Sequence, residues 1–165
     1  MKNLLIEIPA ATSVGDFVAG YSANGLAELS FPRAERVSAR LAGGKVVPAK
    51  IRAWHRVTEA ALQKILAGHA PEKFPPLDLV GTDFQKSVWC ALQKIPAGGT
   101  KSYGEIARAI GRPKAVRAVG GACGANPVPL LVPCHRVLAA NGKIGGFSGG
   151  LDWKRTLLAC EGVKI

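Results

Sequence analysis

The sequence predicts an α/β (α+β) N-terminal domain with a small antiparallel sheet, followed by a mostly helical C-terminal domain containing a helix-turn-helix. Three observations lead to this prediction: strand-like alternation over residues 3–32, helical spacing of apolar residues from Ile51 onward, and a proline-rich segment between the two parts. The 165 residues, 48% of them hydrophobic, are enough to bury a core in one large domain or two small ones.

The N-terminal part is predicted to hold a strand meander and one helix. Apolar residues alternate with others along residues 4–8, and a turn-forming run at 22–25 separates two further apolar segments. Residues 51–67 place apolar side chains on one helical face, and Gly68 stops the helix. Charges, glycines and a proline predict a loop with at most a short helical piece over residues 33–48.

A proline-rich segment marks the boundary between the two domains. Three of the six residues in 71–76 are prolines, which resist both a helix and a central strand. We expect residues 1–75 to form an N-terminal scaffolding domain and residues 76–81 a connector, with a short strand over 77–80. Residues 82–165 then form the C-terminal domain that carries the chemistry.

Helices dominate the predicted C-terminal domain. Thr82 is a good N-cap for a first helix. Two short helices follow, over residues 102–110 and 113–122, and Gly111 lies between them. Two short helices joined by a tight turn make a helix-turn-helix, although an ordinary helical hairpin is the commoner object. A last helix is expected over residues 152–160.

The charge balance and the second of the two short helices indicate a nucleic-acid partner. Lys and Arg number 22 against 11 Asp and Glu, a formal charge of +11 that favours nucleic acid first and an acidic membrane second, though solubility alone also explains it. This helix has small residues such as Ala118 and Gly120, and its charges are Arg112, Lys114 and Arg117. It is suited to phosphates rather than base edges, which predicts DNA binding without sequence specificity.

An apolar, strand-like run over residues 130–138 holds Cys134, His135 and Arg136 at its centre. Pro133 fixes one backbone dihedral, so Cys134 is expected at a kink or a strand end. The neighbouring basic groups favour the thiolate, which is the nucleophilic form of cysteine. The alternative is that Cys134 is a small core residue, as most buried cysteines are.

Several classes of site and location are excluded by the sequence. The four cysteines form no CxxC pair and no zinc-finger spacing, so neither a metal nor a cofactor is expected. The glycine-rich residues 145–150 lack the ending of a P-loop. With no secretory signal and no apolar run long enough for a bilayer, we expect no membrane association, and the unpaired thiols favour the cytoplasm.

Four short motifs, read together, resemble those of the O6-alkylguanine-DNA alkyltransferases. They are PCHRV at 133–137, RAVGG at 117–121, Asn-Pro at 126–127 and LLACEG at 157–162. The resemblance implies a self-consuming, single-turnover methyltransferase that moves an alkyl group from O6 of guanine, and also from O4 of thymine, to the cysteine. It further implies double-stranded DNA as the partner, a helix in the minor groove and a flipped nucleotide.

The same resemblance assigns roles to individual residues. Cys134 accepts the alkyl group, and His135, held by Glu161, takes the thiol proton through a water. Asn126 braces the turn that holds the site, and Tyr103 assists rotation of the nucleotide and hydrogen-bonds the leaving guanine. From the residues alone, Glu161 is either a solvated end residue of the last helix or one held there for a task.

Arg117 resembles the arginine finger that fills the gap in the base stack. The residues expected to bind DNA are Arg117, Tyr103, Ala118, Gly120, Arg136 and Lys114. Those expected to line the substrate pocket are Pro129, Val137, Phe147, Ser148 and Gly149. Many members have Tyr where Phe147 stands, and the zinc-binding cysteines of some members are absent. We expect a monomer and leave clustering on DNA open.

Two other functions compete with alkyl transfer. Alkyltransferase-like proteins only recognise alkylated DNA and replace the acceptor cysteine, whereas Cys134 is present here. A cysteine hydrolase would use Cys134 and His135 as a dyad. Adjacent residues of an extended strand point to opposite faces, so this dyad cannot form without a kink.

Overall fold

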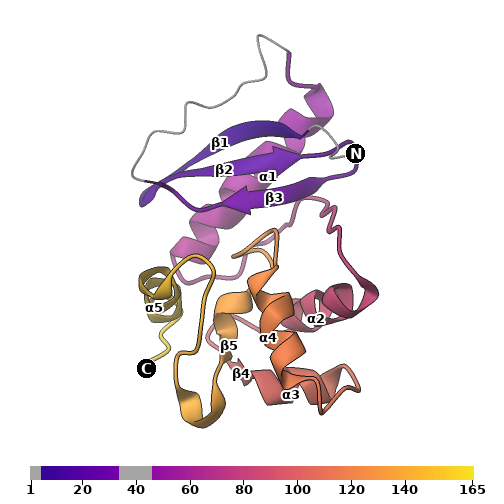
Figure 1. The fold of residues 1–165 in the computed structure, drawn as a ribbon. Helices are drawn as coiled ribbons and strands as arrows, with labels where there is room; N and C mark the ends of the chain where they lie inside the picture. Colours follow the sequence, from indigo (N-terminus) through magenta and orange to yellow (C-terminus); the bar gives the residue numbers. More distant parts are fainter. Residues whose placement is uncertain (1–4, 34–45) are drawn as a thin grey trace.

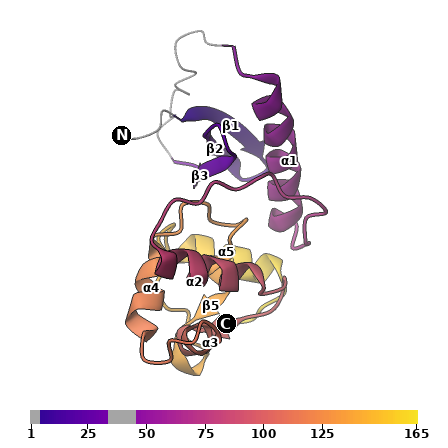
Figure 2. The ribbon, with the colours of Figure 1, turned by 90° about the vertical axis from the view of Figure 1, so that its right-hand side faces the viewer.

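The computed structural model describes residues 5–33 and 46–165 of the chain (Figure 1). A three-stranded sheet and helix α1 make up the N-terminal part, and helices α2 to α5 gather below it (Figures 1 and 2). The predicted α/β N-terminal part and helical C-terminal part are therefore both present. Most of the loop expected over residues 33–48 lies outside the described residues. No helix in the described ranges has the length and apolar character needed to cross a membrane.

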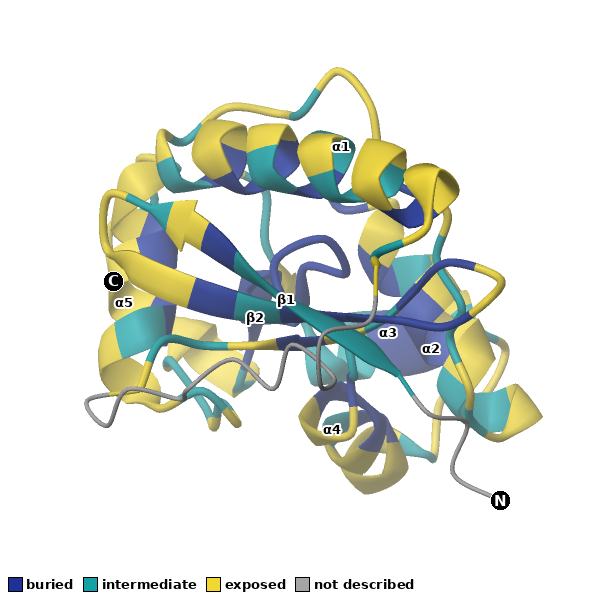
Figure 3. Cartoon of the chain, turned by 90° about the horizontal axis from the view of Figure 1, so that it is seen from above, coloured by how far each residue is buried: buried dark blue, intermediate teal, exposed yellow. Residues whose placement is uncertain are grey.

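The N-terminal sheet is an antiparallel meander in the order β1-β2-β3 with α1 on one face. Alternate residues of β2 are buried, and the buried residues of α1 lie on the side of the helix that faces the sheet (Figure 3). The Tyr21 hydroxyl donates to Thr58 at 2.9 Å, which satisfies the polar groups of this core. The elements are β1 (Ile6–Thr12), β2 (Gly15–Tyr21), β3 (Leu26–Ser30) and α1 (Ala49–Leu66).

Reciprocal caps fix where two of the C-terminal helices begin. The side chain of Thr82 accepts from the backbone amide of Gln85, and the side chain of Gln85 accepts from the backbone amide of Thr82. Ser102 and Glu105 form the same capping box. Trp89 is 1% exposed, and its indole donates to the carbonyl of Ala122 at 2.9 Å, which joins α2 to α4. These elements are α2 (Asp83–Gln93), β4 (Lys101–Ser102), α3 (Tyr103–Ala109), α4 (Val116–Gly124) and α5 (Leu151–Cys160).

Helix α4 begins at Val116, three residues later than the sequence predicts. Pro113 is compatible with a first helical turn, but it lies instead in the turn that leaves α3. The amide of Arg112 donates to the carbonyl of Ala107, and the amide of Ala115 donates to Arg112, which closes that turn locally. The turn chemistry therefore outweighs the preference of proline for a helix start.

The prediction of a strand over residues 130–138 is wrong for most of its length. Local bonds replace a strand ladder: the amide of Cys134 donates to Val132, and that of Arg136 donates to Pro133. Cys134–Arg136 form the short 3₁₀ helix η1, and only β5 (Val137–Leu138) is extended, parallel to β4. The expected strand over 77–80 is likewise reduced to one bridge between Leu77 and Leu26.

Strand β3 and the segment after it fasten the N-terminal sheet to the C-terminal helices. The amide of Leu26 donates to Pro76 at 2.8 Å, and that of Leu29 donates to Pro127 at 2.8 Å. The ring of Phe31 packs on Trp153 of α5 and on Phe147, with centroids 5.0 and 5.7 Å away. The N-terminal part thus positions the loop before α5.

Candidate functional site

Cys134 lies at the start of η1 and lines a small pocket between α3, α4 and the loop before α5. The residue is 4% exposed, and the pocket has a volume of about 160 Å³. Glycines of α4 and of the loop contribute to the wall, so backbone rather than side chains leaves the space open. The lining residues are Tyr103, Gly120, Cys123, Gly124, Cys134, Gly146, Phe147 and Ser148.

A buried carboxylate joins the two basic residues that follow Cys134. Glu161 ends α5 with its side chain 2% exposed, so it is not a solvated end residue. Nε2–H of His135 donates to its Oε1 at 3.0 Å, while Nε–H and Nη2–H of Arg136 donate at 3.0 and 2.7 Å. The amide of Gly98 adds a fourth donor at 3.1 Å. Charge-assisted bonds of this kind hold both side chains in fixed orientations.

The same contacts determine the protonation states of Glu161 and His135. Burial alone would raise the pKa of the Glu161 carboxyl, but the hydrogen bonds from His135 and Arg136 lower it to about 2. Burial lowers the pKa of the His135 imidazole, although Glu161 opposes the shift. His135 is therefore neutral near pH 7, with its proton on Nε2 because a carboxylate accepts there. Its Nδ1 has no hydrogen-bond partner among the described residues, which leaves that nitrogen free to accept a proton.

Burial raises the pKa of the Cys134 thiol, while Asn126 and the ammonium of Lys154 oppose the shift. Lys154 is fully buried, and its Nζ donates to the carbonyl oxygens of Val137 at 2.7 Å and Gly146 at 3.0 Å. Sequence reasoning missed this cation. The sequence does hold a signal for it. Lys154 lies three residues before Leu157 and therefore on the same apolar face of α5, where an apolar side chain is expected.

Asn126 closes the loop that leads to Cys134. Its side-chain nitrogen donates to Val132 at 2.7 Å, and its side-chain oxygen accepts from the amide of Val128 at 3.0 Å. Tyr103 lies across the pocket, where its hydroxyl donates to Gly146 at 3.4 Å. Asn126 thus ties the two ends of this loop together, and Tyr103 faces the pocket; their roles in the reaction stay predictions.

The expected pocket residues are only partly brought together. Phe147 and Ser148 line the pocket, whereas Gly149, the next residue of the loop, packs against Phe31 and does not line it. Pro129 and Val137 do not line it either, because Pro129 is held in a backbone bridge before η1 and Val137 lies buried in β5. These three assignments are corrected.

The expected DNA-binding residues differ in how far they are buried, and Arg136 is the one that lies inside the protein. Lys114, Arg117 and Ala118 are exposed around the start of α4, and Gly120 lines the pocket. Arg136 is 8% exposed and is bound to Glu161 and to the carbonyl of Ile95. Its burial argues against the expected contact with DNA.

Cys123 is one of three pocket-lining residues that sequence reasoning missed, together with Gly124 and Gly146. It lines the pocket together with Cys134, but burial raises its pKa to about 12, so it stays a neutral thiol near pH 7. The described residues contain no cluster of His, Cys, Asp or Glu able to hold a metal ion. Among the described residues, the ionisable side chains at or next to the pocket other than Cys123 are Cys134, His135, Lys154 and Tyr103, and burial raises the pKa of the Tyr103 hydroxyl.

Known proteins resemble this chain in both sequence and fold. The family described as 6-O-methylguanine DNA methyltransferase, DNA binding domain, matches residues 83–163. A crystal structure of Mycobacterium tuberculosis OGT in complex with DNA has a TM-score of 0.75 and 39% identity, covering 93% of this chain and 90% of that one. An O6-methylguanine DNA methyltransferase from Methanococcus jannaschii has a TM-score of 0.70 and 28% identity, covering 96% of this chain and 95% of that one.

Sequence relatives carry the same name in different organisms. A methylated-DNA–protein-cysteine methyltransferase of Mycolicibacterium paratuberculosis is 59% identical over 95 residues, which span 58% of this chain and 58% of that relative. One from Methanosarcina acetivorans is 51% identical over 107 residues, which span 65% of this chain and 69% of the relative. The chain belongs to the methylated-DNA–protein-cysteine methyltransferase family.

Proposed function

We propose that this protein repairs alkylated DNA by moving the alkyl group from O6 of guanine to Cys134 in a single turnover. The observation that carries the proposal is a buried thiol beside a small pocket, next to a neutral histidine that Glu161 fixes through one ring nitrogen. The names of the relatives support the reaction class. O4-alkylthymine would present an equivalent alkyl ether and is the second proposed substrate.

The proposed reaction is a nucleophilic displacement. Nδ1 of His135 takes the Cys134 proton through one bridging water, because Nε2 is committed to Glu161. The thiolate attacks the alkyl carbon, a C–S bond forms, and the C–O6 bond breaks with its electron pair leaving on guanine. Tyr103 hydrogen-bonds the leaving guanine, and Lys154 stabilises the thiolate. The thioether product is a stable C–S linkage that protein thiols and imidazoles do not cleave, so one molecule repairs one lesion.

A cysteine hydrolase that uses Cys134 and His135 as a dyad is the weaker alternative, although the strand argument against it no longer applies. Cys134 and His135 lie in a 3₁₀ turn rather than in a strand, so the expectation of opposite strand faces does not apply. Among the described residues, however, Nδ1 of His135 accepts no hydrogen bond from the Cys134 thiol. A water-bridged relay is consistent with this arrangement.

DNA is the proposed partner, bound by α3, its following turn and α4 as a helix-turn-helix. Cβ atoms added at Gly120, Gly121 or Gly124 would meet no atom within 4 Å, so this face of α4 is open for close approach to a minor groove. The target nucleotide must be flipped to reach a buried thiol, and Arg117 is the proposed finger that fills the gap. We propose that the protein acts as a monomer.

The proposed division of labour follows the two parts of the chain. Residues 1–75 form the scaffold, since Phe31 supports the Phe147 loop, and residues 82–165 carry DNA binding and alkyl transfer after the 76–81 connector. All four cysteines are unpaired, which is consistent with action in the cytoplasm.

Intact-mass analysis after incubation with duplex DNA containing O6-methylguanine tests the reaction. One added methyl group per molecule, carried on the peptide with Cys134, is expected for the wild type and for Cys123→Ala. Cys134→Ala should gain no mass. An unmodified wild type, or methylation of another residue, would contradict the proposed function.

Substitution of Arg117 tests the finger. Arg117→Ala should slow repair of duplex DNA by about tenfold or more, since unstacking a base costs a few kcal/mol, and should leave reaction with the free base O6-benzylguanine nearly unchanged. The exposed Arg155 on α5 provides the matched control, Arg155→Ala. Equal slowing of both reactions would refute the assignment.

The lowered pKa of Glu161 predicts a pH-dependent stability. Because its pKa is about 2 in the folded protein and near 4.5 otherwise, its contribution is complete above about pH 5 and is lost as pH falls towards 2. Glu161→Gln should lower the free energy of unfolding by about 3 kcal/mol at pH 6, and the difference should shrink at low pH. The exposed Glu72→Gln is the control. A difference that stays constant from pH 6 to pH 2 would overturn this account.

A further inference from the structure

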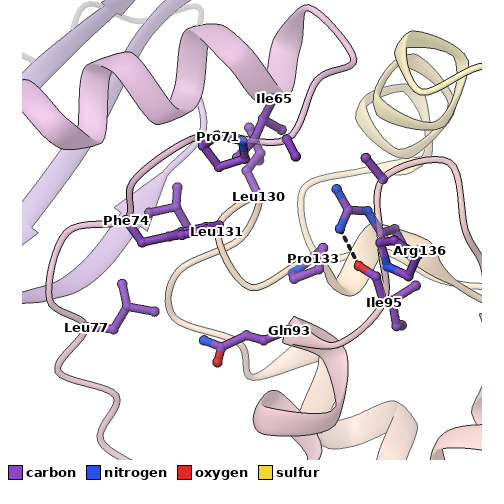
Figure 4. A pocket seen from close by; sticks show the side chains of 13 residues that line it. Ile65, Pro71, Phe74, Leu77, Gln93, Ile95, Leu130, Leu131, Pro133 and Arg136 are labelled. Atoms are coloured by element: carbon purple, nitrogen blue, oxygen red, sulfur yellow. Dashed lines mark hydrogen bonds between the residues drawn. The ribbon is translucent and has the colours of Figure 1, made fainter.

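A larger cavity lies beside the residues that flank Cys134 but shares no lining residue with the Cys134 pocket. Its volume is about 400 Å³, and it lies between the end of α1, the proline-rich segment 71–76, the end of α2 and the segment before η1. Phe74 and Leu77 lie at one end, and Ile95 and Arg136 lie at the other (Figure 4). Small-molecule sites in proteins have volumes of about 300–1,000 Å³, so this cavity is of a suitable size.

The walls of this cavity are held in place by the backbone. Pro71 stiffens the proline-rich segment 71–76, and the hydrogen bonds that Pro76 and Asp78 make with Leu26 fix the end of this segment and the connector to β3. Leu130 has a φ of 72°, a left-handed conformation that a leucine rarely adopts. Such strain persists only where the surroundings over-determine it, and it is frequent at ligand-binding walls. The cavity is therefore preformed.

Arg136 gives the apolar cavity a polar end. Its guanidinium has five N–H donors, of which Nε–H, one on Nη1 and one on Nη2 bind Glu161 or Ile95. The other two have no acceptor among the described residues, and the residue is only 8% exposed. Arg136 lines the cavity, so these N–H groups can donate to an oxygen acceptor placed at this end of it.

The charge around Arg136 decides which acceptor fits. Glu161 already balances the guanidinium and keeps its own negative charge, since its pKa is about 2. An incoming carboxylate would therefore lie close to a like charge without an uncompensated cation to offset it. A neutral carbonyl oxygen can accept the free N–H groups without this repulsion.

We propose that the cavity is a second small-molecule site, which takes a neutral aromatic molecule bearing one carbonyl group. The ring packs against Phe74, Leu77 and Leu130, and the carbonyl accepts from Arg136. Because Arg136 shares the carboxylate of Glu161 with His135, an occupant of this site contacts the proton relay from the side away from the substrate. Binding itself does not depend on alkyl transfer, so this site and the proposed function are tested separately.

N-phenylacetamide serves as the probe, followed by the methyl signals of the isotopically labelled full-length protein in NMR titrations. Saturable shifts are expected for Ile65, Ile95 and Leu130, which line the cavity. Ethylbenzene, which lacks the carbonyl, and benzoate, which is charged, should each bind at least several-fold more weakly. Binding of ethylbenzene or benzoate as tight as that of N-phenylacetamide would overturn the role of Arg136.

Two matched substitutions locate the site. Ala70 is exposed at the cavity wall and Ala60 is exposed on α1 away from it, so Ala70→Trp fills the cavity while Ala60→Trp leaves it open. Ala70→Trp should weaken N-phenylacetamide at least tenfold, and Ala60→Trp should leave its affinity unchanged. The absence of saturable binding to the wild type, or equal binding to both variants, would refute the proposal.

Discussion

The buried carboxylate of Glu161 is the contact on which the functional part of this structure depends. It receives hydrogen bonds from His135, Arg136 and the amide of Gly98, so one side chain joins the end of α5 to η1 and to the loop after α2. An ion pair this deeply buried gives little net stability compared with an apolar replacement, whereas removal of one partner is strongly destabilising. Its value here is geometric, since it fixes which nitrogen of His135 carries the proton.

The rest of the molecule supports the loop on the other side of the pocket. Lys154 holds the carbonyl oxygens of Val137 and Gly146 from within the core, and the ring of Phe31 packs on Phe147 from the N-terminal sheet. A lysine can stay charged in the core only when carbonyl oxygens or an anion accept hydrogen bonds from its ammonium group. A thiolate at Cys134 would be that anion, which links the architecture of the loop to the proposed chemistry.

The helices could be predicted because their signals are local: apolar periodicity, the N-cap residue Thr82 and a glycine stop. Cys134 and its histidine could be singled out because polar groups in an apolar run need partners. The 3₁₀ turn at η1 could not be predicted, because backbone bonds specific to this loop outweigh an extended pattern. The burial of Lys154 and Arg136 depends on residues far along the chain, so the local sequence could not show that Arg136, expected at the DNA interface, is held inside by Glu161 and Ile95.

The protonation of His135 tests the central claim most directly. In ¹⁵N-labelled protein, the ring nitrogen shifts from long-range ¹H–¹⁵N correlation spectra report the tautomer, and a His135→Gln variant assigns the signals. The account predicts a neutral ring at pH 7 with the proton on Nε2 and a bare Nδ1, and a pKa below the ordinary value of about 6.5. A proton on Nδ1 alone, or an imidazolium ring at pH 7, would contradict it.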